Sequence, residues 1–414
     1  MTSHTSIRIS CGECRPASRR HGVHSERVVV LHTVDIRYSK DEMLRNRRRL
    51  ESAYRFDFFN RVPVLLGIEP RYLLDIRGVS FREYFADSQT QLLHQLENIK
   101  WRIENIPDDW FNEPKITVSP DFQNVTNASG CGCEIFWQET ETPQAIQRLS
   151  TIEEMERHQL PEWRNSLWGK KLEWFIRMKE LAGKIDVRLN GERIPVDVTI
   201  GINGDSPFMS AVELAGANFY GWLLEAPALC HDLLRRITDR YIEVEEEYRS
   251  ILGRPMKDGL NYSDDSAQVI SLSQYREFCV PVAKRLYETF GCDRHDGRIM
   301  HLCGRNVHLH EALLHDLHIT LLHGYGSANA PDEMSTLAGK TVMIGNIDPL
   351  TLYQGSESDV EQETSRILEI LAARGGIILG DGYNVVPGTS LSNMEVVRKT
   401  SERFGVPKAL NSAF

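Results

Sequence analysis

Residues 298–304 read RIMHLCG, an apolar run that ends in a histidine, a cysteine and a glycine. Two later stretches share this design: residues 341–349 read TVMIGNIDP and residues 377–383 read IILGDGY. Each apolar run is short enough to be a buried strand, and each stops at glycine and polar residues. In a parallel α/β barrel the functional groups lie at the carboxyl ends of the strands. The three stretches therefore predict barrel strands that carry chemistry at their ends.

Five further strand candidates occur elsewhere in the chain. They are residues 62–68, 116–119, 196–202, 259–262 and 319–322. Segments with a helical spacing of apolar residues separate the candidates, for example residues 226–252 and 273–290. Eight strand candidates that alternate with helices favour a (β/α)8 barrel, a fold of the α/β class, over an open sheet.

The domain organisation follows from this alternation. Residues 41–414 are predicted to form a single (β/α)8 barrel domain with an irregular insertion around 126–170. Residues 1–40 are rich in Ser, Arg and His and lack a sustained period, so they are predicted to be a disordered extension. The alternative is a minimal zinc knuckle, because Cys11-Gly-Glu-Cys14 is followed by His21 and His24.

The composition is that of a soluble globular protein. The 414 residues are 41% hydrophobic and 26% charged, so a sizeable core is available. A formal net charge of −10 argues against a nucleic-acid or membrane-surface partner, since phosphate binding needs basic stripes. No apolar run is long enough to span a membrane, and no signal peptide is expected. The eight scattered cysteines indicate a reducing cytoplasm rather than a disulfide framework.

The barrel interpretation gathers polar groups from separate strand ends around one cavity. The side chains expected there are Arg71, Asp121, Asn203, Asp205, Asp264, Asp265, His301, Cys303, Asn346, Asp348, Asp381 and Tyr383. We predict catalytic roles for Asp121, Asp264, Asp265 and Asp381, and substrate contacts for Arg71, Asn203, Asp205, Asn346, Asp348 and Tyr383. The alternatives are that Asp264-Asp265 is only a polar loop and that Asp348 only braces its turn.

His301 and Cys303 are the predicted metal ligands. They are two residues apart on a strand, so their side chains point to the same side, towards the barrel interior. One imidazole and one thiolate form half of a typical zinc site. The alternative is a buried thiol beside a hydrogen-bonded histidine. Five other histidines in this region are expected on the outer helix as solvated or capping groups; they are His308, His310, His315, His318 and His323.

Several of these stretches carry a family resemblance. Residues 345–349 (GNIDP), 380–393 (GDGYNVVPGTSLSN) and 270–281 (ISLSQYREFCVP) resemble motifs of the uroporphyrinogen decarboxylase superfamily, as does Arg71-Tyr-Leu after the first strand. The superfamily also contains the corrinoid- and coenzyme M-linked methyltransferases. The resemblance extends from about Arg61 to the C-terminus and implies a (β/α)8 barrel.

The decarboxylase branch implies one set of site residues. Arg71 falls at one of its two paired arginine positions, whereas Gly67 occupies the other. Asp121 is the best match to the aspartate after the second strand. Val212 replaces an expected tyrosine, and Asp381 replaces an expected histidine.

The methyltransferase branch implies a zinc site of His-x-Cys and a later cysteine. His301 and Cys303 match its first part, Tyr383 stands near the place of the later cysteine, and Asp381 is the nearest candidate for the third ligand.

Three functional hypotheses follow. The first is a methyltransferase-like enzyme that moves a methyl group from a small methylated donor, with zinc as cofactor and a separate corrinoid protein as partner. The second is a decarboxylase of a porphyrinogen or another carboxylate, which needs no cofactor. The third is a barrel that binds a ligand without chemistry. The Asp-x-His-x-x-Gly signature of a corrinoid module is missing from the chain. The resemblance also implies a homodimer.

Overall fold

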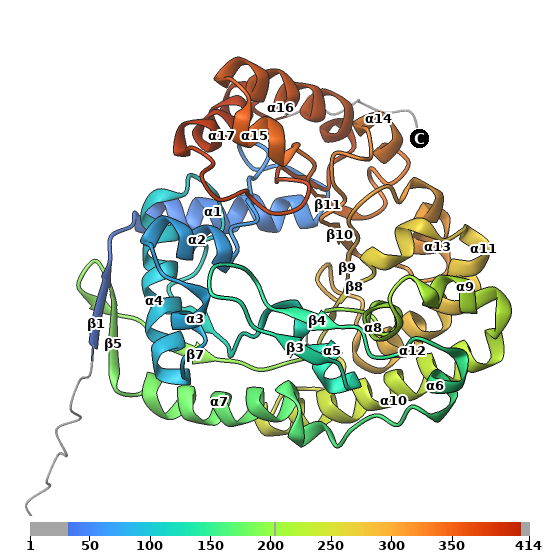
Figure 1. The fold of residues 1–414 in the computed structure, drawn as a ribbon. Helices are drawn as coiled ribbons and strands as arrows, with labels where there is room; N and C mark the ends of the chain where they lie inside the picture. Colours follow the sequence, from blue (N-terminus) through green and yellow to red (C-terminus); the bar gives the residue numbers. More distant parts are fainter. Residues whose placement is uncertain (1–31, 203, 407–414) are drawn as a thin grey trace, which may run out of the picture.

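The computed structural model describes residues 32–202 and 204–406. Eight parallel strand segments surround a central axis, and helices cover the outside (Figure 1). Seven of them are regular strands: β2 (Ile116–Val118), β7 (Val196–Val198), β8 (Leu260–Ser263), β9 (Arg298–His301), β10 (Leu321–His323), β11 (Val342–Ile344) and β12 (Ile377–Ile378). The eighth segment is the chain around Val64, which forms a parallel bridge with Leu379. The predicted (β/α)8 barrel is confirmed.

The strand order closes most of the ring. Strands β12, β11, β10, β9 and β8 are neighbours in that order, and all of their pairings are parallel. A bridge between Asp205 and Ser263 continues the ring from β8 to the segment after β7, and β7 pairs with β2. Between β2 and the Val64 segment the described residues show no strand pairing. There the backbone N–H of Asp109 donates to the carbonyl of Val64 at 2.8 Å.

The first predicted strand is shorter than expected. Of residues 62–68, only the stretch around Val64 pairs with the last strand: Leu65 N–H donates to Leu379 O, and Leu379 N–H donates to Pro63 O. Pro63 has no N–H to donate, which limits the ladder that this segment can form.

The helices alternate with the strands. Their bounds are α1 (Lys40–Tyr54), α2 (Pro70–Arg77), α3 (Phe81–Tyr84), α4 (Ser88–Asn105), α5 (Thr126–Cys131), α6 (Ile152–Arg157), α7 (Leu167–Ala182), α8 (Pro207–Ala215), α9 (Asn218–Glu225), α10 (Pro227–Leu252), α11 (Leu272–Gln274), α12 (Val280–Phe290), α13 (His310–His315), α14 (Pro331–Met334), α15 (Pro349–Gln354), α16 (Glu357–Leu371) and α17 (Leu391–Phe404). The longest, α10, starts with a proline and stops at Gly253, which adopts the left-handed conformation. No helix in the described ranges is both long and apolar enough to cross a membrane.

The N-terminal region differs from the prediction. Strand β1 (His32–Ile36) pairs in parallel with β5 (Ile185–Leu189), whose other neighbour is β6 (Glu192–Arg193). This small sheet lies at the edge of the barrel (Figure 1, left). The part of the expected extension between residues 32 and 40 therefore belongs to the fold. The zinc-knuckle residues Cys11, Cys14, His21 and His24 lie outside the described residues.

The region around residues 126–170 contains short elements of its own. Helix α5 leads into the antiparallel pair β3 (Glu134–Phe136) and β4 (Gln144–Ile146), and α6 follows. Gly130 of α5 packs so closely on Trp168 that an added Cβ would lie 2.2 Å from the indole ring. This contact fixes the predicted insertion to the start of α7.

Candidate functional site

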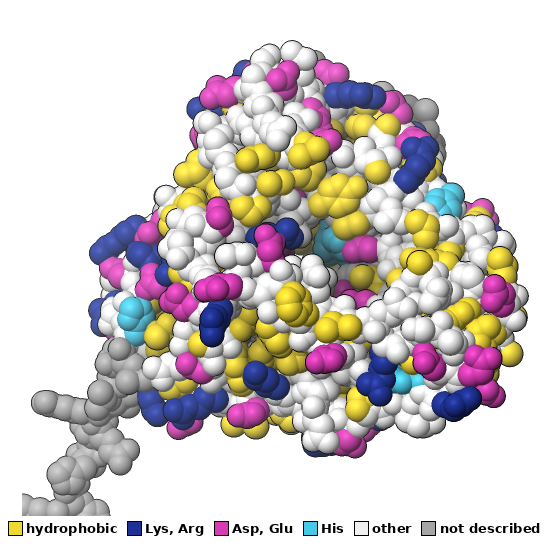
Figure 2. All heavy atoms as spheres, viewed as in Figure 1, with side chains coloured by type: hydrophobic (Ala, Val, Ile, Leu, Met, Phe, Trp, Pro, Cys, Tyr) yellow, Lys and Arg dark blue, Asp and Glu magenta, His cyan; other side chains and the backbone are white. Residues whose placement is uncertain are grey.

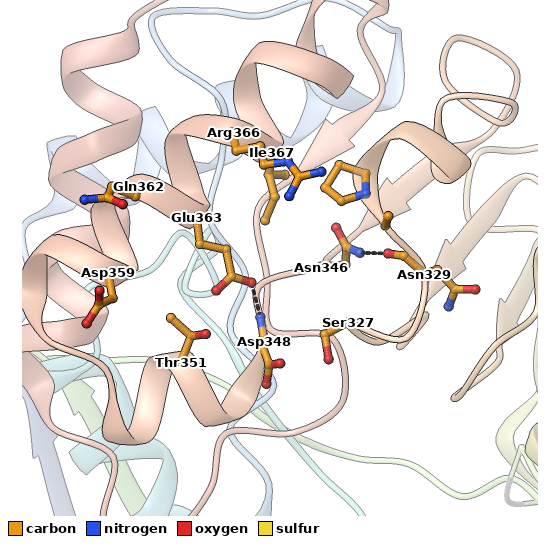
Figure 3. A pocket seen from close by; sticks show the side chains of 12 residues that line it. Ser327, Asn329, Asn346, Asp348, Thr351, Asp359, Gln362, Glu363, Arg366 and Ile367 are labelled. Carbon is orange, nitrogen blue, oxygen red and sulfur yellow. Dashed lines mark hydrogen bonds between the residues drawn. The ribbon is translucent and has the colours of Figure 1, made fainter.

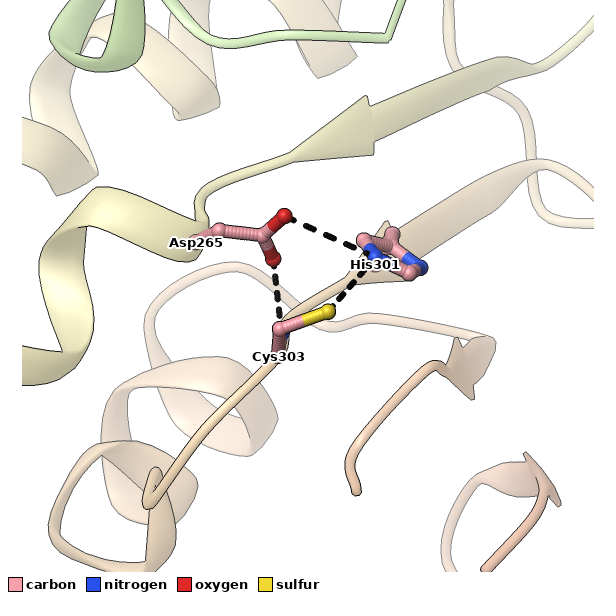
Figure 4. A group of neighbouring side chains, drawn as sticks. All are labelled: Asp265, His301 and Cys303. Atoms are coloured by element: carbon pink, nitrogen blue, oxygen red, sulfur yellow. Dashed lines mark hydrogen bonds and ion pairs between the residues drawn. The ribbon is translucent and has the colours of Figure 1, made fainter. Parts of the chain in front are cut away.

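Asp265, His301 and Cys303 form a compact group at the ends of two adjacent strands (Figure 4). The Nε2 atom of His301 lies 3.1 Å from Cys303 Sγ and 3.6 Å from an oxygen of Asp265. The backbone N–H of Cys303 donates to the other Asp265 oxygen at 2.6 Å. One nitrogen, one sulfur and one oxygen thus lie within 4.8 Å of one another.

The local sequence explains this arrangement. Strand β9 ends at His301, and Cys303 follows on the same side of the chain. Asp265 begins the 3₁₀ turn after β8, the neighbouring strand in the sheet. Gly304 then turns the chain with φ +70°, where an added Cβ would meet Gln268 at 1.6 Å. The glycine is therefore required for the chain to leave the strand at this point.

The chemistry of the group fits zinc. Imidazole, thiolate and carboxylate are all zinc ligands, and three protein ligands leave one position open, as in catalytic sites. Burial, followed by the nearby Asp265 carboxylate, raises the pKa of the Cys303 thiol above its ordinary value. A bound divalent cation would reverse this effect, because it favours the thiolate. Asp265, and not Asp381, is thus the third metal-type group beside His301 and Cys303.

His323 is a residue of the candidate site that the sequence analysis placed elsewhere. It ends β10 and stands in register with His301, so it lies on a barrel strand and not on the outer helix as expected. The Nδ1 atoms of the two rings are 3.1 Å apart. Gly324 permits this approach, because a Cβ there would lie 2.1 Å from the His301 ring. Burial, with a smaller effect of His301, lowers the pKa of His323 to about 3, so its ring is neutral.

Asp381 lies beside Gly67, at the junction of the first and last barrel strands. The backbone N–H of Gly67 donates to Asp381 Oδ1 at 2.5 Å. The side chain is 5% exposed, and its Oδ2 atom has no hydrogen-bond partner among the described residues. Burial raises the pKa of this carboxyl above its ordinary value. Asp381, His323 and Tyr383 line one cavity of about 320 Å³.

The neighbouring acids Asp264 and Asp265 have different surroundings. Asp264 is fully buried and accepts a hydrogen bond from the Ser206 hydroxyl at 2.7 Å. Burial raises the pKa of the Asp264 carboxyl to about 7, which the Ser206 hydrogen bond opposes. Asp205 is also buried: burial raises its pKa to about 7, Asp265 adds to the rise, and Lys171 opposes it. Asn203 lies outside the described residues.

Asp121 lines a different cavity, of about 250 Å³, with Glu69 and Arg102. It accepts hydrogen bonds from the Tyr84 hydroxyl at 3.1 Å and from the side chain of Gln123 at 2.6 Å. Arg71, the predicted partner of acidic substrate groups, is exposed on α2. Neither Asp121 nor Arg71 belongs to the metal-type group.

Asn346 and Asp348 lie in a third place, a pocket of about 480 Å³ beside α15 and α16 (Figure 3). Asn346 donates to the carbonyl of Asn329 at 2.7 Å, and Asp348 caps α15 while its own N–H donates to Glu363 at 2.6 Å. The strand-end rule predicted both residues in the same cavity as His301. The turn after β11 instead directs them towards the outer helices.

The space-filling view shows a hollow at the centre of one face of the molecule (Figure 2). Histidine and acidic side chains are visible inside it, with hydrophobic side chains around them. The candidate site therefore combines polar groups with apolar walls, which is common in ligand pockets.

Comparisons with known proteins agree with this geometry. A family model described as uroporphyrinogen decarboxylase (URO-D) matches residues 121–404, so the chain belongs to this family. The uroporphyrinogen decarboxylase of Xanthomonas campestris is 25% identical over 361 residues, which cover 84% of this chain and 94% of that protein. The decarboxylase of Trichlorobacter lovleyi is 25% identical over 55% of this chain, and the match spans 64% of that relative's length.

Methyltransferases are also among the similar proteins. The methylated-thiol–coenzyme M methyltransferase of Methanosarcina mazei is 23% identical over 70% of this chain and 73% of its own length. The solved structure of a methyltransferase from Methanosarcina mazei matches with a TM-score of 0.60 and 18% identity, and covers 87% of this chain and 98% of that one. This structural match supports the barrel fold. The relatives are enzymes of two kinds within one superfamily.

Proposed function

We propose that the protein is a zinc-dependent enzyme of the methyltransferase-like branch, which transfers a methyl group from a small methylated donor. The observation that carries this proposal is the group of Asp265, His301 and Cys303 at the ends of adjacent strands. A decarboxylase of this superfamily has no need for such a set of ligands, whereas a thiol-methylating enzyme has. A corrinoid protein is the proposed partner, and a cytoplasmic homodimer is the proposed form.

Under this proposal, separate residues of the chain would bind the metal, orient its ligands and hold a proton. His301 Nε2, Cys303 Sγ and an Asp265 oxygen would hold the metal, while His301 Nδ1 faces His323 and keeps the ring oriented. Zinc bound there would supply Lewis acidity and lower the pKa of a coordinated thiol at the open position. The buried Asp205 carboxyl, close to Asp265, would hold a proton near neutral pH. Gly324 and Gly304 fix the two turns that bring these groups together.

Metal analysis of the purified full-length chain tests the proposal. We expect about one zinc per chain, as in catalytic sites with three protein ligands and an open position. The variants Cys303→Ser and His301→Ala should lose it, and Cys292→Ser is the matched control, because Cys292 is a partly buried free cysteine outside the group. Methyl transfer from a methylated thiol to coenzyme M would then be measured with and without chelator. Absence of zinc in the wild type, or full activity of His301→Ala, would reject the proposal.

Decarboxylation is the second candidate, because Asp121 lines a cavity and lies within reach of the Tyr84 hydroxyl. The cationic groups needed for an anionic porphyrinogen are scarce there. Arg102 already binds Asp108 at 2.9 Å and two backbone carbonyls. Incubation with uroporphyrinogen III should therefore give no coproporphyrinogen III. If neither reaction occurs but a ligand binds tightly, the third hypothesis, a non-catalytic ligand-binding barrel, gains support.

A further inference from the structure

A cavity of about 320 Å³ runs along the inside of the barrel, next to the candidate metal group. Its lining includes strand-end residues, such as His323 and Asp381, and residues from the opposite end, such as Tyr54 and Asp296. Ordinary barrels of this fold fill their interior with side chains. Here Asn261 on β8 lines the cavity and is exposed to solvent, so the cavity is open to solvent.

The walls of this axial cavity are apolar. Leu65, Ile299, Leu321 and Ile344 contribute side chains from four different strand segments. They form the cluster that packs around Leu50 and Ala53 of α1. Such a surface favours the aliphatic body of a small molecule, since about 25 cal/mol is gained per Å² of apolar area removed from water.

The charged groups in the lining are two aspartates, one at each end, and the lining contains no lysine or arginine. Asp296 is already paired with Arg294 at 2.9 Å. Asp381 is 5% exposed, and its Oδ2 atom makes no hydrogen bond within the described part of the chain. A buried carboxylate oxygen without a partner is costly, and a ligand that brings a positive charge or an N–H donor removes that cost.

Gly67 places no side chain beside this carboxylate. A Cβ at position 67 would lie 3.0 Å from Asp381 Oδ2 and 3.2 Å from Oδ1. Without that side chain, Asp381 remains part of the cavity lining. Tyr383, which also lines the cavity, offers an aromatic ring of the kind that attracts ammonium groups.

We propose that the axial cavity binds a small alkylammonium ion, with its ammonium group at Asp381 and its alkyl group against Leu65, Ile299, Leu321 and Ile344. An anion of the same shape is disfavoured, because it would meet the Asp381 carboxylate without a compensating cation. The ligand would end beside His323, which contacts His301 of the candidate metal group. The binding itself depends on neither zinc nor methyl transfer.

Calorimetric titration of the full-length protein with isobutylammonium, isobutanol and isobutyrate tests this proposal without any variant. We expect binding of isobutylammonium, weaker binding of isobutanol and none of isobutyrate. Equal binding of the cation and the anion, or no binding of the cation, would overturn the proposal.

Variants then locate the site. Asp381→Asn keeps an oxygen for the Gly67 N–H but removes the charge, so isobutylammonium should bind about tenfold or more weakly, a loss of about 1.4 kcal/mol. Leu321→Phe fills the cavity and should abolish binding, with thermal unfolding as the check that it is folded. Asp239→Asn is the matched control, because Asp239 pairs with Arg235 at 2.9 Å on α10 and does not line the cavity; it should bind within about twofold of the wild type. Unchanged binding by Asp381→Asn would overturn the assignment, whereas Cys303→Ser should retain binding even if the zinc proposal fails.

Discussion

The backbone N–H of Gly67 donates a hydrogen bond to Asp381 across 314 residues of sequence, at 2.5 Å. The family resemblance places an arginine of the decarboxylases at position 67 and a histidine at position 381. Both departures occur here at one point of contact between the first and last barrel strands. The structure gives the physical link, since a side chain at position 67 would occupy the space next to the Asp381 carboxylate. The two positions are therefore in direct steric contact in this structure.

Gly67→Ala tests this contact. The added Cβ would lie 3.0 Å from Asp381 Oδ2 and must displace it, so we expect a loss of about 1–3 kcal/mol in the free energy of unfolding, typical of overpacking. Urea unfolding gives the value. Gly221→Ala in α9 is the control, because the nearest atom to its Cβ would be 4.0 Å away; a helical alanine should stabilise by about 0.5–1 kcal/mol. Similar effects of the two substitutions would argue against close packing at Gly67.

His323 is expected to act as a positioning residue for His301. The variant His323→Phe leaves His301 Nδ1 without its partner at 3.1 Å, so zinc affinity should fall about 10–100-fold. Competition with a chromophoric chelator measures this affinity directly. His323→Asn restores a polar partner and should recover part of the loss, which a purely steric role would not predict. His308→Phe, on the 3₁₀ turn Val307–Leu309, is the control and should leave zinc binding unchanged.

The half-buried acid Glu213, whose Oε2 atom is buried, predicts a specific pH dependence of stability. Burial, with a further contribution from Asp205, raises the pKa of Glu213 to about 8 in the folded chain, well above the ordinary value of 4.5. Between these two values the folded state binds more protons than the unfolded state, so stability decreases as pH rises through this range. At most one proton is involved, which corresponds to a slope of about 1.4 kcal/mol per pH unit.

Urea unfolding of the wild type and Glu213→Gln at pH 5.5, 6.5 and 7.5 measures this contribution. The variant should be less sensitive to pH, and the difference between the two proteins should grow in its favour as pH rises. Parallel pH profiles of the two proteins would show that Glu213 keeps its ordinary pKa.

Much of the barrel is visible in the sequence, because β9 to β12 are short apolar runs that end in glycine or polar residues. Strand β1 is not, because its partner β5 lies about 150 residues further on and the run HTVDI has no strong apolar pattern. A strand pairing over that distance depends on tertiary contacts rather than on local spacing.

The candidate site was predictable only where residues share one strand. The alternation along β9 placed His301 and Cys303 on the same side. Placing His323 beside His301 requires the register between β9 and β10, and this register cannot be read from the sequence. Asp264 and Asp265 are adjacent in the sequence, so the predicted end of the strand does not indicate which of the two carboxylates faces the cavity. Asn346 follows a correctly predicted strand, but the turn after β11 directs it into a separate pocket.

Asp109 provides a last prediction, about the seam of the barrel. It is fully buried and accepts hydrogen bonds from Arg49 at 2.9 Å, from Arg61 at 2.8 Å and from the backbone N–H of Val64 at 2.8 Å. It thus joins α1 to the first barrel segment, at the place where the described residues show no strand pairing. Asp109→Ala would leave two arginines buried without their shared partner, so we expect a loss of about 3–5 kcal/mol in unfolding free energy.

Urea unfolding also measures this loss, and two further variants define its origin. Asp109→Asn keeps the acceptor for Val64 but not the charge, so it should lie between Asp109→Ala and the wild type. Glu192→Ala removes an exposed pair with Lys40 and should cost less than about 1 kcal/mol. An equally small cost for Asp109→Ala would contradict this prediction. It would mean that the two guanidinium groups find water or other acceptors in the variant, and that apolar packing alone holds the seam.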